Sequence, residues 1–158
     1  EGPDAAPGHI RAFDVHTGQR KWIFHTIPTE NEPGIETWAG DTAKNGAATT
    51  WVTGSYDPDL NLTYWGTAQA KPWMTLTRGT EDDALYSSST LALNADDGKL
   101  KWHFQHAPAE ALDLDIVFER VLVDAGGQKL VFTIGKDGIL WKLNRQTGKI
   151  KVPTVPKA

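Results

Sequence analysis

Two carboxylates stand two residues apart in the run LDLD at 112–115. Side chains at positions i and i+2 of an extended segment point to the same face, so Asp113 and Asp115 are expected to face the same way. Two like charges that lie close together raise each other's pKa unless a cation lies between them. The spacing alone leaves two interpretations open, which are a bound cation and a pair of ordinary surface acids.

Several other kinds of chemistry lack the residues they need. The sequence has no cysteine, which excludes disulfides, thiolate metal sites and cysteine catalysis. The serine run at 87–89 lacks the Gly-x-Ser-x-Gly turn of a serine hydrolase. The five histidines show no zinc-binding spacing; they are His9, His16, His25, His103 and His106. The net charge of −4, without a cluster of Lys and Arg, argues against nucleic acid as a partner, and no apolar run approaches the roughly 20 residues that span a bilayer.

One phrase occurs three times along the chain, at 10–24, 91–104 and 140–152. In each copy an apolar strand ends at Asp or Asn, turns through Gly and enters a second strand, which predicts a β-hairpin. Further strand-like runs lie at 49–58, 60–68, 120–126, 129–135 and 138–144. The segment 110–120 fits either a short helical turn or a loop that enters a strand.

The repeated phrase also has a turn glycine in every copy and a tryptophan after it in two copies. Trp22 and Trp102 each follow a turn glycine by four residues, whereas Val152 stands at that place in the third copy. A flat indole ring can lie between neighbouring sheets and bury about 150–250 Å². The pattern predicts an all-β fold, a β-propeller segment of two to three four-stranded blades with tryptophan-docking repeats. Three unrelated hairpins in a sandwich, or a complete small β domain, are the alternatives.

These phrases resemble the tryptophan-docking repeats of the quinoprotein alcohol dehydrogenases, eight-bladed propellers that bind pyrroloquinoline quinone (PQQ). The resemblance runs in order through TTWVTGSYDPDLNLTYWGTAQAKPWM, YSSSTLAL, KLKWHFQHAPAEALDLD and TIGKDGILWKLNRQTGK. It implies that 1–158 is a partial quinoprotein β-propeller, an internal piece of a larger ring. Residues 1–24 would end one blade, 41–104 would form a second blade with inserted loops, and 105–158 would form a partial third blade.

The resemblance implies catalytic and cofactor-binding roles. Trp51 matches the tryptophan that forms the floor under the planar quinone, although it could be a packing residue. Asp113 matches the carboxylate that accepts the alcohol proton, but Leu112 replaces the tryptophan that precedes it in the family. Lys136 matches the basic residue that hydrogen-bonds the reactive side of the quinone, where a cation stabilises a developing oxyanion; an ordinary turn lysine is the alternative. Five other tryptophans are interpreted as packing residues: Trp22, Trp65, Trp73, Trp102 and Trp141.

The resemblance also implies a Ca²⁺ or lanthanide site with Asp113, Asp115, Gln69 and Glu1 as ligands. Asp115 resembles the additional ligand of the lanthanide-using branch, where added negative charge suits a hard trivalent ion. Gln69 stands where the family has Asn, so its oxygen lies on a longer arm, and the substitution fits either a shifted ligand or a decayed site. Glu1 matches the family's glutamate only if the sequence PDAAP is an insertion.

The implied function is part of a periplasmic PQQ-dependent dehydrogenase. It would oxidise an alcohol or a sugar by hydride transfer to metal-bound PQQ and pass electrons to a cytochrome-type acceptor. The alternative is a non-catalytic propeller scaffold that keeps the docking repeats without a cofactor, which Gln69 and Leu112 favour. We expect the piece alone to be inactive, because an open arc of blades cannot enclose a cofactor.

Overall fold

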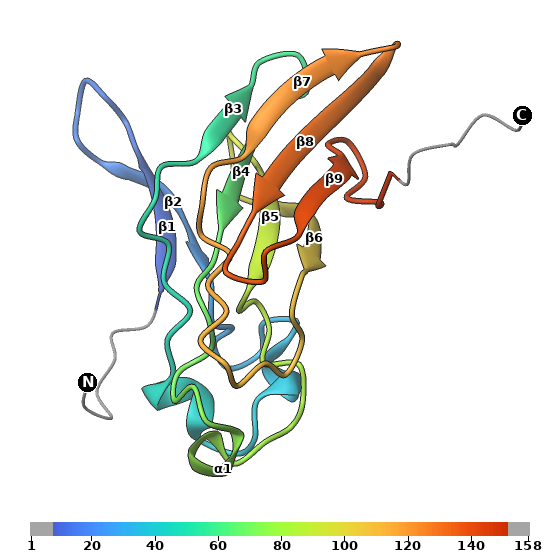
Figure 1. Ribbon diagram of the computed structural model, residues 1–158. Helices are drawn as coiled ribbons and strands as arrows, with labels where there is room; N and C mark the ends of the chain where they lie inside the picture. Colours follow the sequence, from blue (N-terminus) through green and yellow to red (C-terminus); the bar gives the residue numbers. More distant parts are fainter. Residues whose placement is uncertain (1–7, 152–158) are drawn as a thin grey trace, which may run out of the picture.

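The computed structural model describes residues 8–151, which form three antiparallel sheets (Figure 1). The first sheet pairs β1 (His9–Phe13) with β2 (Arg20–His25). The second has the order β3 (Ser55–Asp57), β4 (Leu62–Gly66), β5 (Ser89–Asn94) and β6 (Leu100–Gln105). The third has the order β7 (Val121–Ala125), β8 (Gln128–Ile134) and β9 (Leu140–Asn144). The all-β prediction is confirmed, while the blade bounds 1–24, 41–104 and 105–158 stay a prediction.

The repeated phrase folds as its turn chemistry predicts. The first copy forms the β1–β2 hairpin and the second forms β5–β6, while the third continues from β9 through a turn to an isolated bridge between Leu143 and Ile150. The last residue before the third turn, Asn144, accepts hydrogen bonds at Oδ1 from the backbone N–H groups of Gln146 and Thr147. Such Asn and Asp side chains cap the turn locally, which explains their place in every copy.

The tryptophans of the repeat dock on the next copy's turn. Trp22 Nε1 donates to Ala95 O at 2.9 Å, and the Trp22 ring lies against Gly98. Trp102 Nε1 donates to Arg145 O at 3.1 Å, and its ring lies against Gly148. Each ring therefore joins one sheet to the turn of the following copy, and the interpretation of Trp22 and Trp102 as packing residues is confirmed.

Gly148 is expected to be indispensable for this docking. It has φ +71°, and a Cβ atom there would lie 2.6 Å from Trp102 Cε3. Gly127 has φ +70° but would place its Cβ atom in open space, so it provides a matched control. Both alanine variants carry the backbone cost of about 1–2 kcal/mol. We expect Gly148→Ala to cost about 1–3 kcal/mol more, from the ring displacement, measured by urea unfolding. Equal losses would contradict the docking role.

The long stretch after β2 forms a cap of short helices. It contains the 3₁₀ helices η1 (Ile35–Thr37) and η2 (Thr42–Asn45), and they lie with α1 (Thr75–Arg78) beyond one end of the sheets (Figure 1). Trp38 is buried here in an apolar cluster, and its Nε1 donates to Leu85 O at 2.5 Å. This inserted segment after β2 therefore forms a small core, to which Ala70 and Ala84 from later loops also belong.

Some expectations were wrong. The run 49–58 is strand only at Ser55–Asp57, because the residues before β3 form an irregular segment. Trp73 is 47% exposed, so it is not a packing residue within the described part of the chain. The segment 110–120 is irregular and leads into β7, as the loop interpretation expected.

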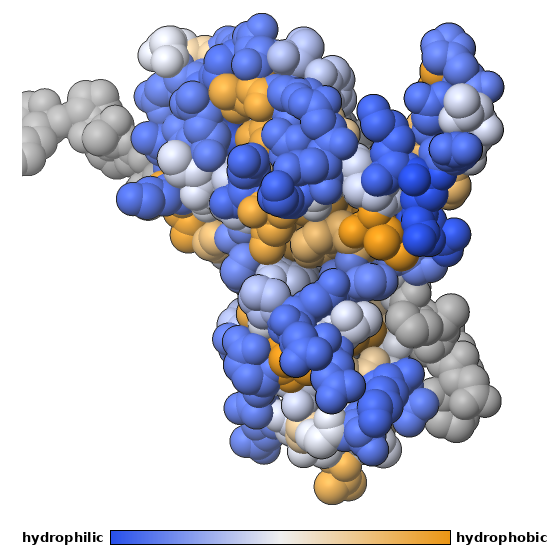
Figure 2. Space-filling view, turned by 180° about the vertical axis from the view of Figure 1, so that it is seen from behind, coloured by the Kyte–Doolittle hydropathy of each residue, from blue (hydrophilic) through white to orange (hydrophobic). Residues whose placement is uncertain are grey.

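On the face shown in Figure 2, polar residues dominate and apolar residues gather in patches between them. No helix in residues 8–151 is long and apolar enough to cross a membrane.

His106 lies buried after β6, and its protonation should set part of the acid sensitivity. Its ring meets Phe104 and Trp141 edge-on, each with centroids 4.9 Å apart, and its Nε2 is 2.8 Å from Thr90 Oγ1. Burial lowers the pKa of His106 from 6.5 to about 3, and the nearby Arg120 charge adds to the shift. Between pH 6.5 and about 3, His106 is therefore protonated in the unfolded chain but not in the folded chain.

The free energy of unfolding should fall as the pH drops from 6.5 toward 3, by about 1.4 kcal/mol per pH unit from this residue. We expect His106→Gln to remove that contribution to the slope, whereas His16→Gln, at an exposed turn position, should leave it unchanged. Urea unfolding at pH 7 and at pH 4.5 measures the difference. Identical pH slopes in the wild type and in His106→Gln would show that the buried ring is not the cause.

Candidate functional site

The structure brings five of the six predicted site residues around one hollow of about 380 Å³. They come from four segments far apart in the sequence: the run before β3, the run after β4, the irregular run before β7 and the turn after β8. The lining residues are Thr49, Trp51, Ala68, Gln69, Lys71, Asp113, Asp115 and Lys136. The sixth, Glu1, lies outside the described residues. The hollow is predominantly polar, which suits charged chemistry.

Lys136 links the two carboxylates. Its Nζ donates to Asp115 Oδ2 at 2.5 Å and to Asp113 Oδ2 at 3.0 Å. These contacts raise the pKa of Lys136, mostly through the hydrogen bond to Asp115 and then through the one to Asp113. The two acids thus share one cation, here the Lys136 ammonium, whereas the spacing alone had left a cation and ordinary surface acids open. The extended backbone from which their common direction was expected is not found, since Asp113 has φ 62° and the segment is not a regular strand.

Gln69 and Asp115 are joined directly. The Gln69 backbone N–H donates to Asp115 Oδ1 at 3.1 Å, and both residues are only 6% exposed. Two backbone hydrogen bonds support this contact, one from Ala68 N to Thr49 O at 2.9 Å and one from Ile116 N to Thr67 O at 3.3 Å. The loops that carry the candidate ligands are therefore fixed to each other by the backbone.

Trp51 presents an open aromatic surface on the wall of the hollow. It is 57% exposed, and its ring meets Phe118 edge-on with centroids 6.0 Å apart. A packing tryptophan is normally covered, so this exposure weakens the packing interpretation. The exposed indole can stack on a planar ligand, since aromatic groups attract one another in offset or tilted contacts.

Lys71 and Thr49 also line the hollow and were missed from the sequence. Lys71 stands two residues after Gln69, directly before Pro72, and its backbone N–H donates to Ala47 O at 2.9 Å. Lys71 could have been found from the sequence, because it is a basic residue in the same loop as the candidate ligand Gln69. Thr49 gave no such signal, since its place depends on how two distant loops pair.

A metal ion fits the donors of this hollow. Asp113, Asp115 and Gln69 offer carboxylate and amide oxygens, the ligands that hard cations prefer. The ammonium of Lys136 already occupies a position between the two carboxylates, which shows that the site accepts positive charge there. In residues 8–151 no group of three or more His, Cys, Asp and Glu side chains is suited to a metal. A bound cation would therefore need oxygen ligands beyond these three residues.

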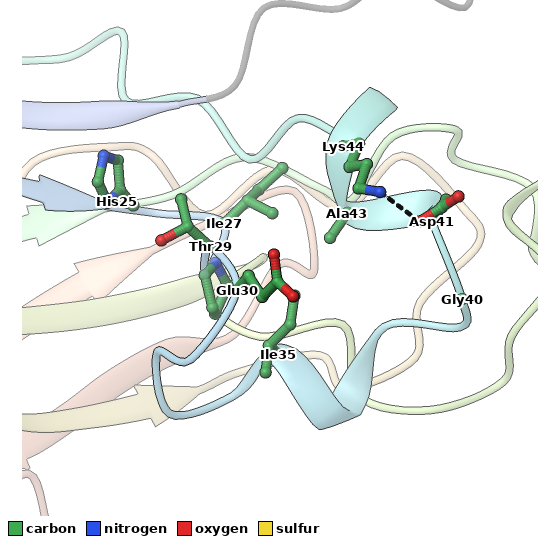
Figure 3. Close-up of a pocket in the computed structure, with 10 residues that line it drawn as sticks. His25, Ile27, Thr29, Glu30, Ile35, Gly40, Asp41, Ala43 and Lys44 are labelled. Carbon is green, nitrogen blue, oxygen red and sulfur yellow. Dashed lines mark ion pairs between the residues drawn. The ribbon is translucent and has the colours of Figure 1, made fainter.

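A second cavity of about 330 Å³ lies in the inserted segment (Figure 3). Ile27, Ile35 and Ala43 give it an apolar wall, and Lys44 Nζ pairs with Asp41 Oδ1 at 2.6 Å beside it. Both members of that ion pair are strongly exposed. Glu30, Asp41 and Lys44 also line this cavity, but it has no tryptophan and none of the predicted site residues in its lining, so we place the candidate site in the polar hollow.

The three antiparallel sheets, joined by tryptophans that dock on the following turn, are those of a β-propeller segment. The PQQ family described as glucose/ethanol/alcohol dehydrogenase, β-propeller domain, matches residues 1–157, and the chain belongs to this family. The prediction of a propeller segment is therefore confirmed. Within residues 8–151 the three sheets do not close into a ring.

Individual relatives support this assignment. The chain is 37% identical to quinoprotein alcohol dehydrogenase PedH of Pseudomonas putida, over 90% of this chain and 27% of that protein. It is 31% identical to a lanthanide-dependent methanol dehydrogenase of Methylacidiphilum fumariolicum, over 90% of this chain and 27% of that protein. The crystal structure of quinohemoprotein alcohol dehydrogenase from Comamonas testosteroni matches with a TM-score of 0.86 and 31% identity, over 94% of this chain and 25% of that one. The chain thus spans about a quarter of the length of these relatives.

Proposed function

We propose that this chain is part of a periplasmic PQQ-dependent dehydrogenase that oxidises an alcohol or a sugar. A cytochrome-type protein would accept the electrons. The observation that carries the proposal is the convergence of Trp51, Gln69, Asp113, Asp115 and Lys136 on one hollow. Family membership adds support, since several relatives are named as quinoprotein or quinohemoprotein alcohol dehydrogenases.

When bound, PQQ with its cation would supply an electrophilic carbonyl that takes a hydride from the carbon bearing the substrate hydroxyl. Asp113 would accept the hydroxyl proton, which suits a carboxylate that is partly open to the hollow. Lys136 would donate a hydrogen bond where negative charge develops. Trp51 would hold the planar group by stacking on it.

Gln69, Asp113 and Asp115 would hold the cation through oxygen atoms. A metal ion and the Lys136 ammonium would compete for the same two carboxylates, because Nζ now bonds to both. Metal binding would therefore weaken the ion pairs of Lys136 with the two carboxylates and leave its ammonium able to donate elsewhere in the hollow. Ca²⁺ and a lanthanide ion both accept such ligands, and the second carboxylate favours the trivalent ion.

The proposal is tested by titrating the whole protein with PQQ in the presence of Ca²⁺ or La³⁺. We expect a saturable quinone absorbance change, together with reduction of an artificial electron-accepting dye when ethanol is added. A Trp51→Ala variant should bind PQQ more weakly by about 1–3 kcal/mol, the range for stacking on an aromatic side chain. A protein that shows neither the absorbance change nor dye reduction would instead be the non-catalytic scaffold.

A further inference from the structure

One buried guanidinium joins the two loops that carry the candidate metal ligands. Arg78 has 0% exposure, and its Nη1 donates to Pro72 O and Trp73 O, each at 3.1 Å. Its Nη2 donates to Glu110 O at 3.0 Å. Burial lowers the pKa of Arg78, while the charge of Glu110 acts in the opposite direction. Arg78 therefore anchors Glu110 to the loop that follows β4.

Glu110 in turn holds the backbone on both sides of the candidate base. Its Oε2 accepts hydrogen bonds from Leu112 N at 2.9 Å and from Leu114 N at 3.1 Å. Between these two amides lies Asp113, with φ 62°. A left-handed conformation is unfavourable for a residue other than glycine and persists only where its surroundings hold it.

The same pair carries buried polar atoms without partners. Glu110 Oε1 and Arg78 Nε are both buried and make no hydrogen bond in the part of the chain that the structure describes. Such atoms are uncommon in native proteins and need an explanation. Here the carboxylate uses its other oxygen, Oε2, to bridge two backbone amides, and this geometry leaves Oε1 unpaired.

We propose that Glu110, anchored by Arg78, is a positioning residue that holds Asp113 in the left-handed conformation in which its carboxylate meets Lys136 beside Asp115. The inference rests on the proposed function, since it concerns the residue proposed as base and ligand. Loss of the bridge would let the backbone at Asp113 relax toward an extended conformation. The carboxylates of Asp113 and Asp115 would then no longer converge on one cation.

The first test measures backbone protection in the whole protein without metal or cofactor. Hydrogen exchange by mass spectrometry reports on a peptide that contains the Leu112 and Leu114 amides. We expect Glu110→Ala to accelerate exchange there by about 10-fold or more, because both amides lose their acceptor. Glu110→Gln should restore protection, since its amide oxygen can accept the same bonds. Glu119→Ala, which removes an exposed acid from the same segment, should change nothing.

The second test measures the site with Tb³⁺ as the probe, through luminescence sensitised by tryptophan. Loss of a residue that orients a metal ligand typically weakens metal binding by about 10–100-fold, which we expect for Glu110→Ala and not for Glu110→Gln or Glu119→Ala. If Glu110→Ala does not fold, Glu110→Asp replaces it, because the shorter arm cannot bridge both amides.

The outcomes separate the two proposals. Unchanged exchange in the Glu110 variants overturns the inference. Faster exchange with unchanged Tb³⁺ affinity also overturns it, because the bridge would then be structural only. A wild-type protein that binds no Tb³⁺ counts against the proposed function, and in that case the exchange result alone decides whether Glu110 holds Asp113.

Discussion

Asp113→Asn is expected to lower kcat for alcohol oxidation by about 10²–10⁴-fold, the usual contribution of general base catalysis. The amide has nearly the same shape and keeps an oxygen that can accept the Lys136 hydrogen bond, now 3.0 Å long. It cannot take a proton from the substrate. Because Asp113 is also a proposed metal ligand, the variant should need more Ca²⁺ or La³⁺, but at saturating metal it should still bind PQQ while turnover is lost.

Steady-state dye reduction, with the quinone absorbance as a measure of bound cofactor, separates these two effects. Glu119→Gln is the matched control, since it neutralises an exposed acid in the same segment and should keep normal turnover. An Asp113→Asn protein that binds PQQ and oxidises alcohol within a few-fold of the wild-type rate would show that another group accepts the proton.

Asp115→Asn should change which cation the site prefers. Two unit charges 4 Å apart interact by about 1–4 kcal/mol for an effective dielectric constant between 80 and 20. When Asp115 is neutralised, a trivalent ion loses three times this interaction energy and a divalent ion loses twice it. The preference for La³⁺ over Ca²⁺ should therefore fall by about 5-fold to 1,000-fold.

Competition between La³⁺ and Ca²⁺ in the apo protein, followed by calorimetry, measures this preference. Asp83→Asn removes an exposed acid that does not line the hollow and should leave the preference unchanged. The pKa of Lys136 should also fall in Asp115→Asn, because the hydrogen bond to Asp115 is the largest cause of its upward shift. An unchanged preference would remove Asp115 from the set of metal ligands.

Local signals made much of the fold predictable. Gly98 has the positive φ that its turn needs, and because it has no side chain it leaves room for the ring of Trp22 from the preceding copy. One glycine thus serves the hairpin and the docking of the preceding tryptophan, so the repeated phrase predicts both together. The β7–β8 and β8–β9 hairpins follow from alternation and turn residues in the same way.

The convergence of the site residues was predicted only through the order of the family phrases. No local pattern places Trp51 beside Lys136, since 84 positions separate them in the sequence. The left-handed backbone at Asp113 was also unpredictable, because Glu110, which bonds the amides on both sides of it, is itself bonded by Arg78 from a loop 32 positions away. The types of the residues next to Asp113 in the sequence do not indicate a hydrogen bond from a distant loop.

Buried charges were the least predictable feature. Arg78 and Arg120 are almost fully buried, although charged residues are expected at the surface. Arg120 Nη2 donates to Ile116 O at 2.6 Å and to Thr90 Oγ1 at 3.0 Å, and it thereby fixes the irregular segment against β5. Each arginine satisfies carbonyls of loops that lack regular pairing, a need that arises only once the loops have met.

Side chains from four segments outside the strands are expected to meet around one cation beside one quinone. Anomalous diffraction from crystals of the whole protein grown with PQQ and La³⁺ measures this arrangement. We expect a single strong peak in the hollow, about 2.3–2.6 Å from oxygen atoms of Asp113 and Asp115, with quinone density over Trp51. A peak elsewhere, or an empty hollow in which Lys136 still bridges the two carboxylates at saturating La³⁺, would contradict it.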